Sequence, residues 1–346
     1  MNRTLKAFLI ALALIVVGAV LAGGSLFVIT ETQDSFVEDK RLITTQETIT
    51  EDFFNIEIDV LEANVTFFPS PDGTCYYKVE THSDILCTAT VENGTLYIRQ
   101  EDTRKWYQRI GLGWMNNSLE VYLPKETYAQ LTVNGDTSDI TVSKGLTFAN
   151  ASILTSTGSI NWYAEVHEQL NLTCSTGWVV VNGTNGKGLR TPQTLTVLTS
   201  TGMVSLQNVT AQNISVTTST GGCLLRNTRA QQKLYLSSST GDHELVDVTC
   251  GSLELRSTTG DNELTNVVVA GDAKMESDTG DWELEGFDAA NITITTDTGD
   301  VEGTLLSEKL FFTDTHTGDV EVPRTTSGGR CEITTDTGDI EIEIAP

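Results

Sequence analysis

The dipeptide Thr-Gly recurs ten times between residues 157 and 338, at nearly constant spacing. A period in this range is typical of a solenoid or array, in which each repeat stacks on its neighbours. The longest interval contains NGTNGKG at 182–188, which we interpret as a loop insertion. The ten glycines are separated by 19, 25, 19, 20, 19, 20, 19, 19 and 20 residues and are Gly158, Gly177, Gly202, Gly221, Gly241, Gly260, Gly280, Gly299, Gly318 and Gly338.

Positions at a fixed distance from each glycine predict which side chains face inward. Five residues before the glycine the side chain is apolar in every repeat except the one with Thr313. Three residues before it stands Thr, Ser or Cys, and four residues after it Leu, Val or Ile is frequent. Alternating apolar positions on both sides of the glycine predict two strands that line one core. Glycine itself supplies the positive φ that a tight corner requires.

The fold class that follows is all-β. Residues 53–130 alternate with the same period of two, and no apolar stripe of helical period occurs beyond residue 30. One architecture is a single-stranded β-solenoid with coils of 19–20 residues; the other is an antiparallel meander with Thr-Gly hairpins. Repetition of one residue type at one level favours the β-solenoid. We expect an N-terminal β region at 53–130 and the Thr-Gly(-Asp) repeat solenoid at 131–346.

The N-terminus carries a targeting signal. Arg3 and Lys6 precede an uncharged apolar run at 7–29, which is long enough to cross about 30 Å of hydrocarbon. Acidic residues follow the run, so the charges predict a single-pass protein of the cell membrane with a cytoplasmic N-terminus and an extracellular remainder. Residues 1–30 would be a cytoplasmic tip and transmembrane signal-anchor, and 31–52 a polar juxtamembrane spacer. A cleaved signal peptide is the alternative.

The charge is strongly acidic, with a formal net charge of −26. Residues 241–346 hold 25 acidic and 5 basic residues, which is −20 of that total. This excludes a nucleic-acid partner, because phosphate binding needs clustered Lys and Arg. Oxygen-rich corners could bind Ca²⁺, the one cofactor considered; the alternative is a solvated acidic face that prevents association. The candidate calcium ligands are Asp278, Asp281, Asp297, Asp300, Asp336 and Asp339.

A second candidate site is the segment at 99–117, which is unusually rich in basic and aromatic residues. Such a loop can bind a sugar ring, an anionic wall polymer or a lipid headgroup. Alternatively, its aromatic side chains pack back on the first coils. The candidate binding residues are Arg104, Lys105, Trp106, Tyr107, Arg109 and Trp114.

The cysteines allow one disulfide bond. Cys75 and Cys87 flank a predicted hairpin and could bridge it. Cys174, Cys223 and Cys331 fall on inward columns in different coils, so we expect buried free thiols there. The histidines have no metal-ligand spacing, and no catalytic motif occurs, so we expect a protein that is not an enzyme.

The repeats also carry a family resemblance. The turns STG, TDTGDV and TDTGDI, the VYLPKE segment at 121–126 that leads into LTVNGDTSDITV, and the N-terminal apolar run resemble the bacterial putative-adhesin family of TG-repeat β-strand proteins. The resemblance covers residue 53 to the C-terminus. It implies a β-solenoid on the outer side of a bacterial membrane, association with envelope-stress systems in some members, and no catalytic residues.

These observations rank three functions. The first is a binding, adhesion or structural module toward cell-wall polymers or other surfaces. The second is an accessory sensor that contacts membrane signalling proteins of an envelope-stress system, and the third is a polysaccharide-active β-helix enzyme. Because the chain stops soon after Gly338, we expect that repeat to be the open end of the stack, protected by Glu341 and Glu343.

Overall fold

The structure is a computed structural model that describes residues 42–104, 117–183 and 192–345. By contacts, Thr44–Pro346 forms a compact unit that is separate from the residues before it. In the described ranges no helix has the length and apolar character needed to span a membrane. The predicted anchor at 7–29 lies outside them.

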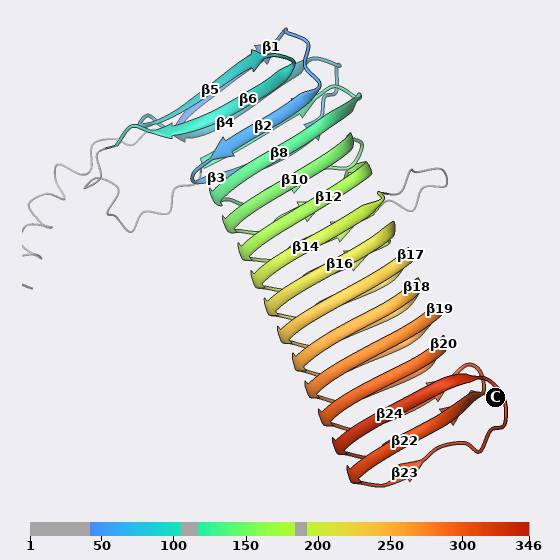
Figure 1. Ribbon diagram of the computed structural model, residues 1–346. Coiled ribbons are helices and arrows are strands. Elements are labelled where there is room, and N and C mark those ends of the chain that lie inside the picture. Colours follow the sequence, from blue (N-terminus) through green and yellow to red (C-terminus); the bar gives the residue numbers. More distant parts are fainter. Residues whose placement is uncertain (1–41, 105–116, 184–191, 346) are drawn as a thin grey trace, which may run out of the picture. The chain divides into compact units, whose positions relative to one another are not determined.

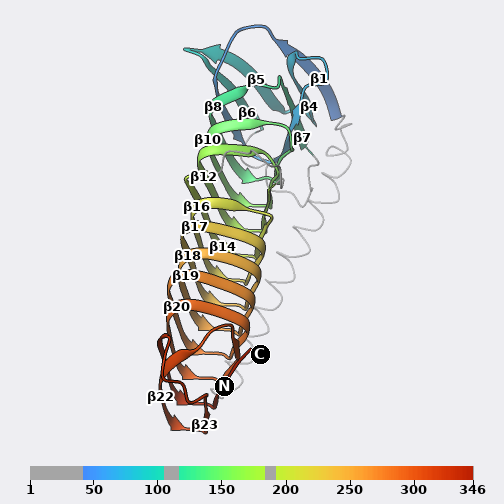
Figure 2. The same cartoon turned by 90° about the vertical axis from the view of Figure 1, so that its right-hand side faces the viewer.

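The repeats form a β-solenoid, as predicted. Consecutive coils pair in parallel, with Ile153 opposite Leu172 and Thr157 opposite Thr176. The antiparallel meander is therefore wrong, and the coils lie one above the next along the stack (Figure 1, and from the side in Figure 2). Parallel pairing in register explains why each column keeps one residue type, because every side chain stacks on its equivalent.

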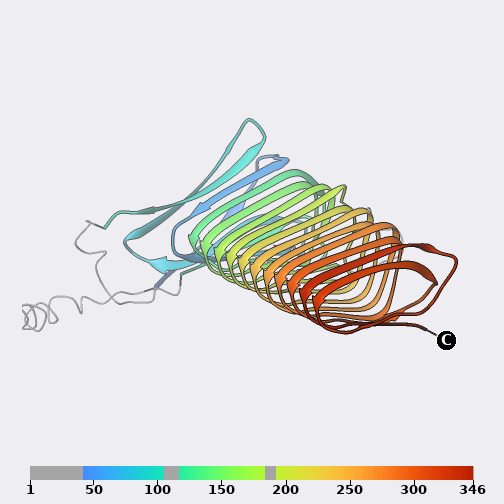
Figure 3. The ribbon, with the colours of Figure 1, turned by 60° about the horizontal axis from the view of Figure 1, so that its bottom comes forward.

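Each coil consists of a long strand, the Thr-Gly corner and a shorter strand, and Figure 3 shows the coils stacked one behind the next. The long strands are β8 (Thr127–Thr137), β10 (Thr147–Thr157), β12 (Glu165–Thr176), β14 (Thr194–Thr201), β16 (Thr210–Thr220), β22 (Lys309–Thr317) and β24 (Gly329–Thr337). The shorter strands are β9 (Ile140–Val142), β11 (Ile160–Trp162), β13 (Val179–Asn182), β15 (Val204–Gln207), β21 (Val301–Leu305), β23 (Val320–Glu321) and β25 (Ile340–Ile344). In four coils the strand is continuous from corner to corner: β17 (Cys223–Thr240), β18 (His243–Thr259), β19 (Asn262–Thr279) and β20 (Trp282–Thr298).

The alternation between 19 and 20 residues is absorbed at one bend. Between β17 and β18 the pairing is regular up to Ala230 opposite Cys250, shifts, and resumes with Lys233 opposite Ser252. The extra residue is therefore a bulge that leaves both neighbouring faces in register. The columns on either side of the Thr-Gly corner therefore stay in register, although the repeat length alternates between 19 and 20 residues.

The corner glycines are required for two reasons. Gly260 has a φ of 137°, which side chains rarely tolerate. A Cβ atom built on Gly260 would also lie 2.4 Å from the carbonyl oxygen of Gly241 in the preceding coil. Stacked corners thus leave no room for a side chain, which explains the invariant glycine.

The core confirms the inward columns. The apolar residues five before and four after the glycine are buried, for example Leu255 and Leu264, while Thr313 is only half-buried. The hydroxyl column differs in detail from the expectation of bonds along the column. Thr155 donates to the carbonyl of Ser138 and Thr335 to that of Gly299, so several of these side chains bind the corner of the adjoining coil instead.

At the N-terminal end the order of the coils differs from the order of the sequence. The coil of β2 (Asn55–Val60) and β3 (Ala63–Pro69) lies between β8 and β9 on one side and, on the other, β6 (Thr95–Asp102) and β7 (Asn117–Leu123). Outside these, β4 (Cys75–His82) is antiparallel to β7 and β5 (Ile85–Glu92) is antiparallel to β6. The expected boundary at 130 falls inside β8, because both regions belong to one stack.

The expected polar spacer also needs a correction. Part of it forms β1 (Leu42–Ile49), which pairs with β4. The Tyr77 hydroxyl donates to the Glu47 carboxylate at 2.7 Å, which ties β1 to the solenoid. The spacer interpretation failed because β1 is exposed on both faces and so lacks an apolar period.

The C-terminal end shows the same rearrangement. The coil of β24 and β25 inserts between β20 with β21 on one side and β22 with β23 on the other (Figure 1). The prediction that the Gly338 repeat ends the stack is therefore wrong, and the Gly318 repeat is outermost. The chain crosses the inserted coil near Lys309, whose buried ammonium lies 2.6 Å from Asp288 Oδ1.

Candidate functional site

The acidic residues after the corner glycine form a hydrogen-bonded ladder. The amide of Asp300 donates to Oδ1 of Asp281 at 2.8 Å, and the amide of Asp339 donates to Oδ1 of Asp300 at 2.7 Å. The same bond joins Asp261 to Asp242, Asp281 to Asp261, and Asp319 to Asp339. Each carboxylate thus binds the backbone amide of the next coil, which satisfies a donor that the sheet leaves open and offsets the repulsion between stacked charges.

The six candidate calcium ligands do not form one cluster. Asp281, Asp300 and Asp339 belong to the ladder, with one oxygen each accepting an amide of the adjoining coil. The other three, Asp278, Asp297 and Asp336, lie before the glycine in a separate exposed column. Among the residues that the structure describes, no three carboxylate, thiol or imidazole side chains converge in the way a metal ion requires.

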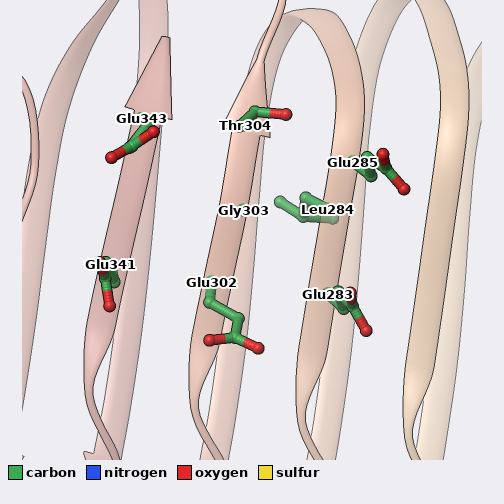
Figure 4. Close-up of a pocket in the computed structure, with 8 residues that line it drawn as sticks. All are labelled: Glu283, Leu284, Glu285, Glu302, Gly303, Thr304, Glu341 and Glu343. Atoms are coloured by element: carbon green, nitrogen blue, oxygen red, sulfur yellow. The ribbon is translucent and has the colours of Figure 1, made fainter. Parts of the chain in front are cut away.

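A shallow acidic groove lies on the next strands. It surrounds Gly303, where the backbone packs too closely on the Leu284 carbonyl group to admit a Cβ atom, and Figure 4 shows two rows of side chains beside it. The lining glutamates are Glu283, Glu285, Glu302, Glu341 and Glu343. Glu302 stands opposite Glu341 because β25 pairs with β21. The two glutamates expected to protect the end of the stack therefore line a groove between interior coils.

Most of the predicted binding loop lies outside the part of the chain that the structure describes. The candidate binding residues in that part are Lys105, Trp106, Tyr107, Arg109 and Trp114. Arg104 is described, and its side chain is only 8% exposed because it pairs with Asp102 at 2.7 Å. The hydrogen bonds to Asp102 raise the pKa of the guanidinium further. Arg104 therefore has a structural role and is not a surface cation.

The predicted disulfide bond is absent, because the structure has Cys75 and Cys87 as free thiols. The two residues lie on β4 and β5, which pair with different partner strands. Burial raises the pKa of each thiol to about 12, so the reactive thiolate is scarce near neutral pH. Cys174, Cys223 and Cys331 are buried free thiols, which confirms that expectation.

One buried polar group was missed by the sequence analysis. His243 is 0% exposed and stacks between Cys223 and Asn262 in register. Its Nε2 lies 2.8 Å from Ser238 Oγ, whereas Nδ1 has no partner among the described residues. Burial lowers the pKa of the imidazole to about 4, although Asp242 opposes the shift. A Ser–His pair sealed in the core cannot reach a substrate, so it is not a nucleophilic site.

A second ladder was also missed. The bend after the shorter strand is occupied in four coils by a residue with a positive φ between 48° and 55°. These residues are Asn208, Asn227, Asp247 and Asn266. The amide of the Asn227 side chain donates to Asn208 Oδ1 at 2.7 Å. Their spacing of 19 or 20 residues is visible in the sequence, and Asn and Asp tolerate this conformation better than other side chains do.

The ladder after the corner glycine is interrupted in the middle of the stack. Trp178 and Met203 stand there instead of Asp, and their side chains are 60% and 38% exposed. The two residues occupy equivalent positions in adjoining coils, since β13 pairs with β15. Exposed large apolar residues in the midst of a polar column are the strongest departure from the repeat pattern.

The fold and its surface define an all-β repeat protein whose outer faces are ladders of repeated side chains. The chain belongs to the Toastrack DUF4097 family, whose model matches residues 53–343. The matched range runs from the start of β2 into β25 and includes the β4 and β5 strands. A search of curated proteins returns no match.

Several solved structures are similar over most of their length. A putative adhesin from Bacteroides fragilis is 14% identical, with a TM-score of 0.35, and the match covers 88% of this chain and 98% of that one. A putative lipid binding protein from Parabacteroides distasonis is 12% identical, with a TM-score of 0.42 and coverage of 87% and 97%. A putative cell adhesion protein from Clostridium sporogenes is 7% identical, with a TM-score of 0.30 and coverage of 88% and 100%.

Proposed function

We propose that the chain is a non-catalytic binding module of the cell surface, which attaches to envelope polymers or to other surfaces. One observation carries the proposal: the coils present equivalent side chains in register along the stack, as in the aspartate ladder from Asp242 to Asp300. A surface that repeats at about 4.8 Å is suited to a ligand that itself repeats, because each new coil adds another equivalent contact.

The absence of enzyme activity is part of the proposal. The carboxylates of the ladder are held by backbone amides, so they are not arranged as a free acid and base pair. The Ser238–His243 pair is buried. The acidic groove around Gly303 is lined mainly by glutamates, without a basic partner among its lining residues.

The proposal also places the chain in the cell membrane through residues 7–29, with the solenoid outside the cell. The charge pattern around that run supports this orientation. Neither calcium nor any other cofactor is part of the proposed binding.

The test uses the full chain in detergent. Fluorescently labelled protein is incubated with insoluble peptidoglycan sacculi, cellulose and chitin, and the bound fraction is measured after sedimentation. Saturable retention on at least one polymer, competed by the same polymer without label, is expected. Sedimentation no greater than that of a labelled, detergent-solubilised membrane protein of unrelated fold contradicts the proposed function. A parallel assay for released reducing sugar should show no turnover.

A further inference from the structure

The position after each corner glycine normally caps the next coil. Asp139 Oδ1 accepts the amide of Ser159 at 2.7 Å, and Ser159 Oγ accepts the amide of Trp178 at 3.4 Å. From Asp242 onward every neighbour is an aspartate whose Oδ1 accepts the next amide. In spatial order the column is Asp139, Ser159, Trp178, Met203, Gly222, Asp242, Asp261, Asp281, Asp300, Asp339 and Asp319.

Three consecutive amides in this column lack the cap. The residues before them in the stack are Trp178, Met203 and Gly222, which have no side-chain acceptor. Among the described residues no group accepts the amides of Met203, Gly222 or Asp242. Aspartate at 178 and 203 would supply the missing acceptors at no cost to the corner geometry. The chain therefore forgoes a stabilising contact that it uses at most other coils and exposes an indole and a thioether instead.

The loss of a stabilising cap in favour of exposed apolar side chains is typical of a binding site, where residues are selected for function and not for stability. A tryptophan that is 60% exposed presents part of a flat apolar face, and the uncapped amides beside it are directed donors. The hydroxyl residues Ser200 and Thr201, which are also exposed, precede the same corner. An apolar platform with hydrogen-bond donors around it matches the alternation of C–H faces and oxygen atoms in a sugar ring.

We propose that the corner formed by Trp178, Met203 and Gly222 binds the sugar rings of a neutral polysaccharide. One ring stacks on the indole of Trp178, and the amides of Met203 and Gly222 donate to its hydroxyl or acetamido oxygens. Two exposed apolar side chains cover far less than the roughly 800 Å² per partner that a stable protein interface needs. They are sufficient for one or two sugar rings.

The local charge fits this ligand. Residues 131–240 contain 4 acidic and 6 basic residues, in contrast to the −20 of residues 241–346. The site therefore lies outside the strongly acidic part of the stack, where an anionic polymer would be repelled and a basic partner attracted. A neutral glycan fits this part of the stack, because its binding requires neither a positively nor a negatively charged protein surface.

The inference rests on the proposed function, since it names the ligand and the site of the same binding. The test compares the wild-type full chain with the double variant Trp178→Asp/Met203→Asp on chitin, cellulose and peptidoglycan sacculi. The variant restores the acceptors for two amides, so we expect its thermal unfolding midpoint to be equal or higher. Its affinity for the retained polymer should nevertheless fall at least tenfold.

Leu86→Asp is the matched control, because Leu86 is 51% exposed on β5, away from this corner. It should bind like the wild type. Equal binding by the double variant, with the wild type retained, overturns the site and leaves the proposed function intact. Failure of the wild type on all three polymers overturns both. A lower unfolding midpoint in the double variant contradicts the premise that these positions forgo a cap.

Discussion

The buried imidazole of His243 gives the solenoid a calculable dependence of stability on pH. In the folded chain burial lowers the pKa from 6.5 to about 4. Between these two values the unfolded chain binds a proton that the folded chain excludes, so the free energy of unfolding falls as the pH falls through this window. The full shift corresponds to about 3 kcal/mol, of which about 2 kcal/mol is lost between pH 8 and pH 5.

The substitution that isolates this effect is His243→Asn, since Asn262 occupies the same level in the next coil. Urea unfolding of the full chain, followed by circular dichroism at pH 8, 7, 6 and 5, gives the free energy at each pH. The wild type should lose about 2 kcal/mol across the series, and the variant much less. His316→Asn, at an exposed position, should behave like the wild type.

The prediction is refuted if the free energy of unfolding falls by the same amount between pH 8 and pH 5 in the wild type and in His243→Asn. The carboxylates, including the ladder, would then cause the acid sensitivity. Measurement above pH 5 limits that contribution, because carboxyl groups titrate mainly at lower pH. A stability that does not change with pH in the wild type would mean that the core admits the proton and that His243 is solvated.

Three further predictions concern the corners. Gly260→Ala should destabilise the fold by about 3 kcal/mol or more, because its Cβ would lie 2.4 Å from the Gly241 oxygen; Gly73→Ala, with no atom within 4 Å, should cost about 1 kcal/mol for its positive φ alone. Urea unfolding measures both, and equal costs would contradict the role of stacking. Asp281→Leu should lose about 1 kcal/mol through the uncapped amide of Asp300, whereas Asp281→Asn, which keeps an oxygen acceptor, should lose less; the reverse order would mean that charge, not the bond, matters. Millimolar Ca²⁺ should raise the unfolding midpoint no more than Mg²⁺ at equal ionic strength, and a calcium-specific rise would restore the metal hypothesis.

The period and the inward columns were predictable because both are properties of a single repeat. A corner glycine, an apolar residue five before it and another four after it recur in the sequence, and the parallel register then follows from stacking like on like. The aspartates after the corner glycines, from Asp242 to Asp339, are exposed. Their bonds to the next coil's amide were not foreseen, because that contact depends on how far apart two corners lie in space.

Most repeats carry no information on the order of the coils, because one coil can stack on another with the same register. One residue did carry the information. Thr313 breaks the apolar column and belongs to the outermost coil, where a half-buried hydroxyl is tolerated, whereas Ile333 and Cys331 of the inserted coil are fully buried. A polar residue in an otherwise apolar column thus marks an end of a stack, even when the repeat is not last in the sequence.

The insertion of the final coil changes how the protein would yield to mechanical load. A solenoid whose last residues formed its outermost layer would lose its strands from that end one after another, because each strand would be paired on one side only. Here a pull on Ile344 acts on a strand that is bonded to β21 on one side and, through the same coil, to β23 on the other. The pull first opens the pairs with β21 at Ile344, Glu343 and Ile342, and then meets Glu341 and Ile340, which are held by β21 and β23 at the same time. The inner part of the strand therefore yields only when bonds on both sides break, and the outermost layer continues into other coils at both of its ends.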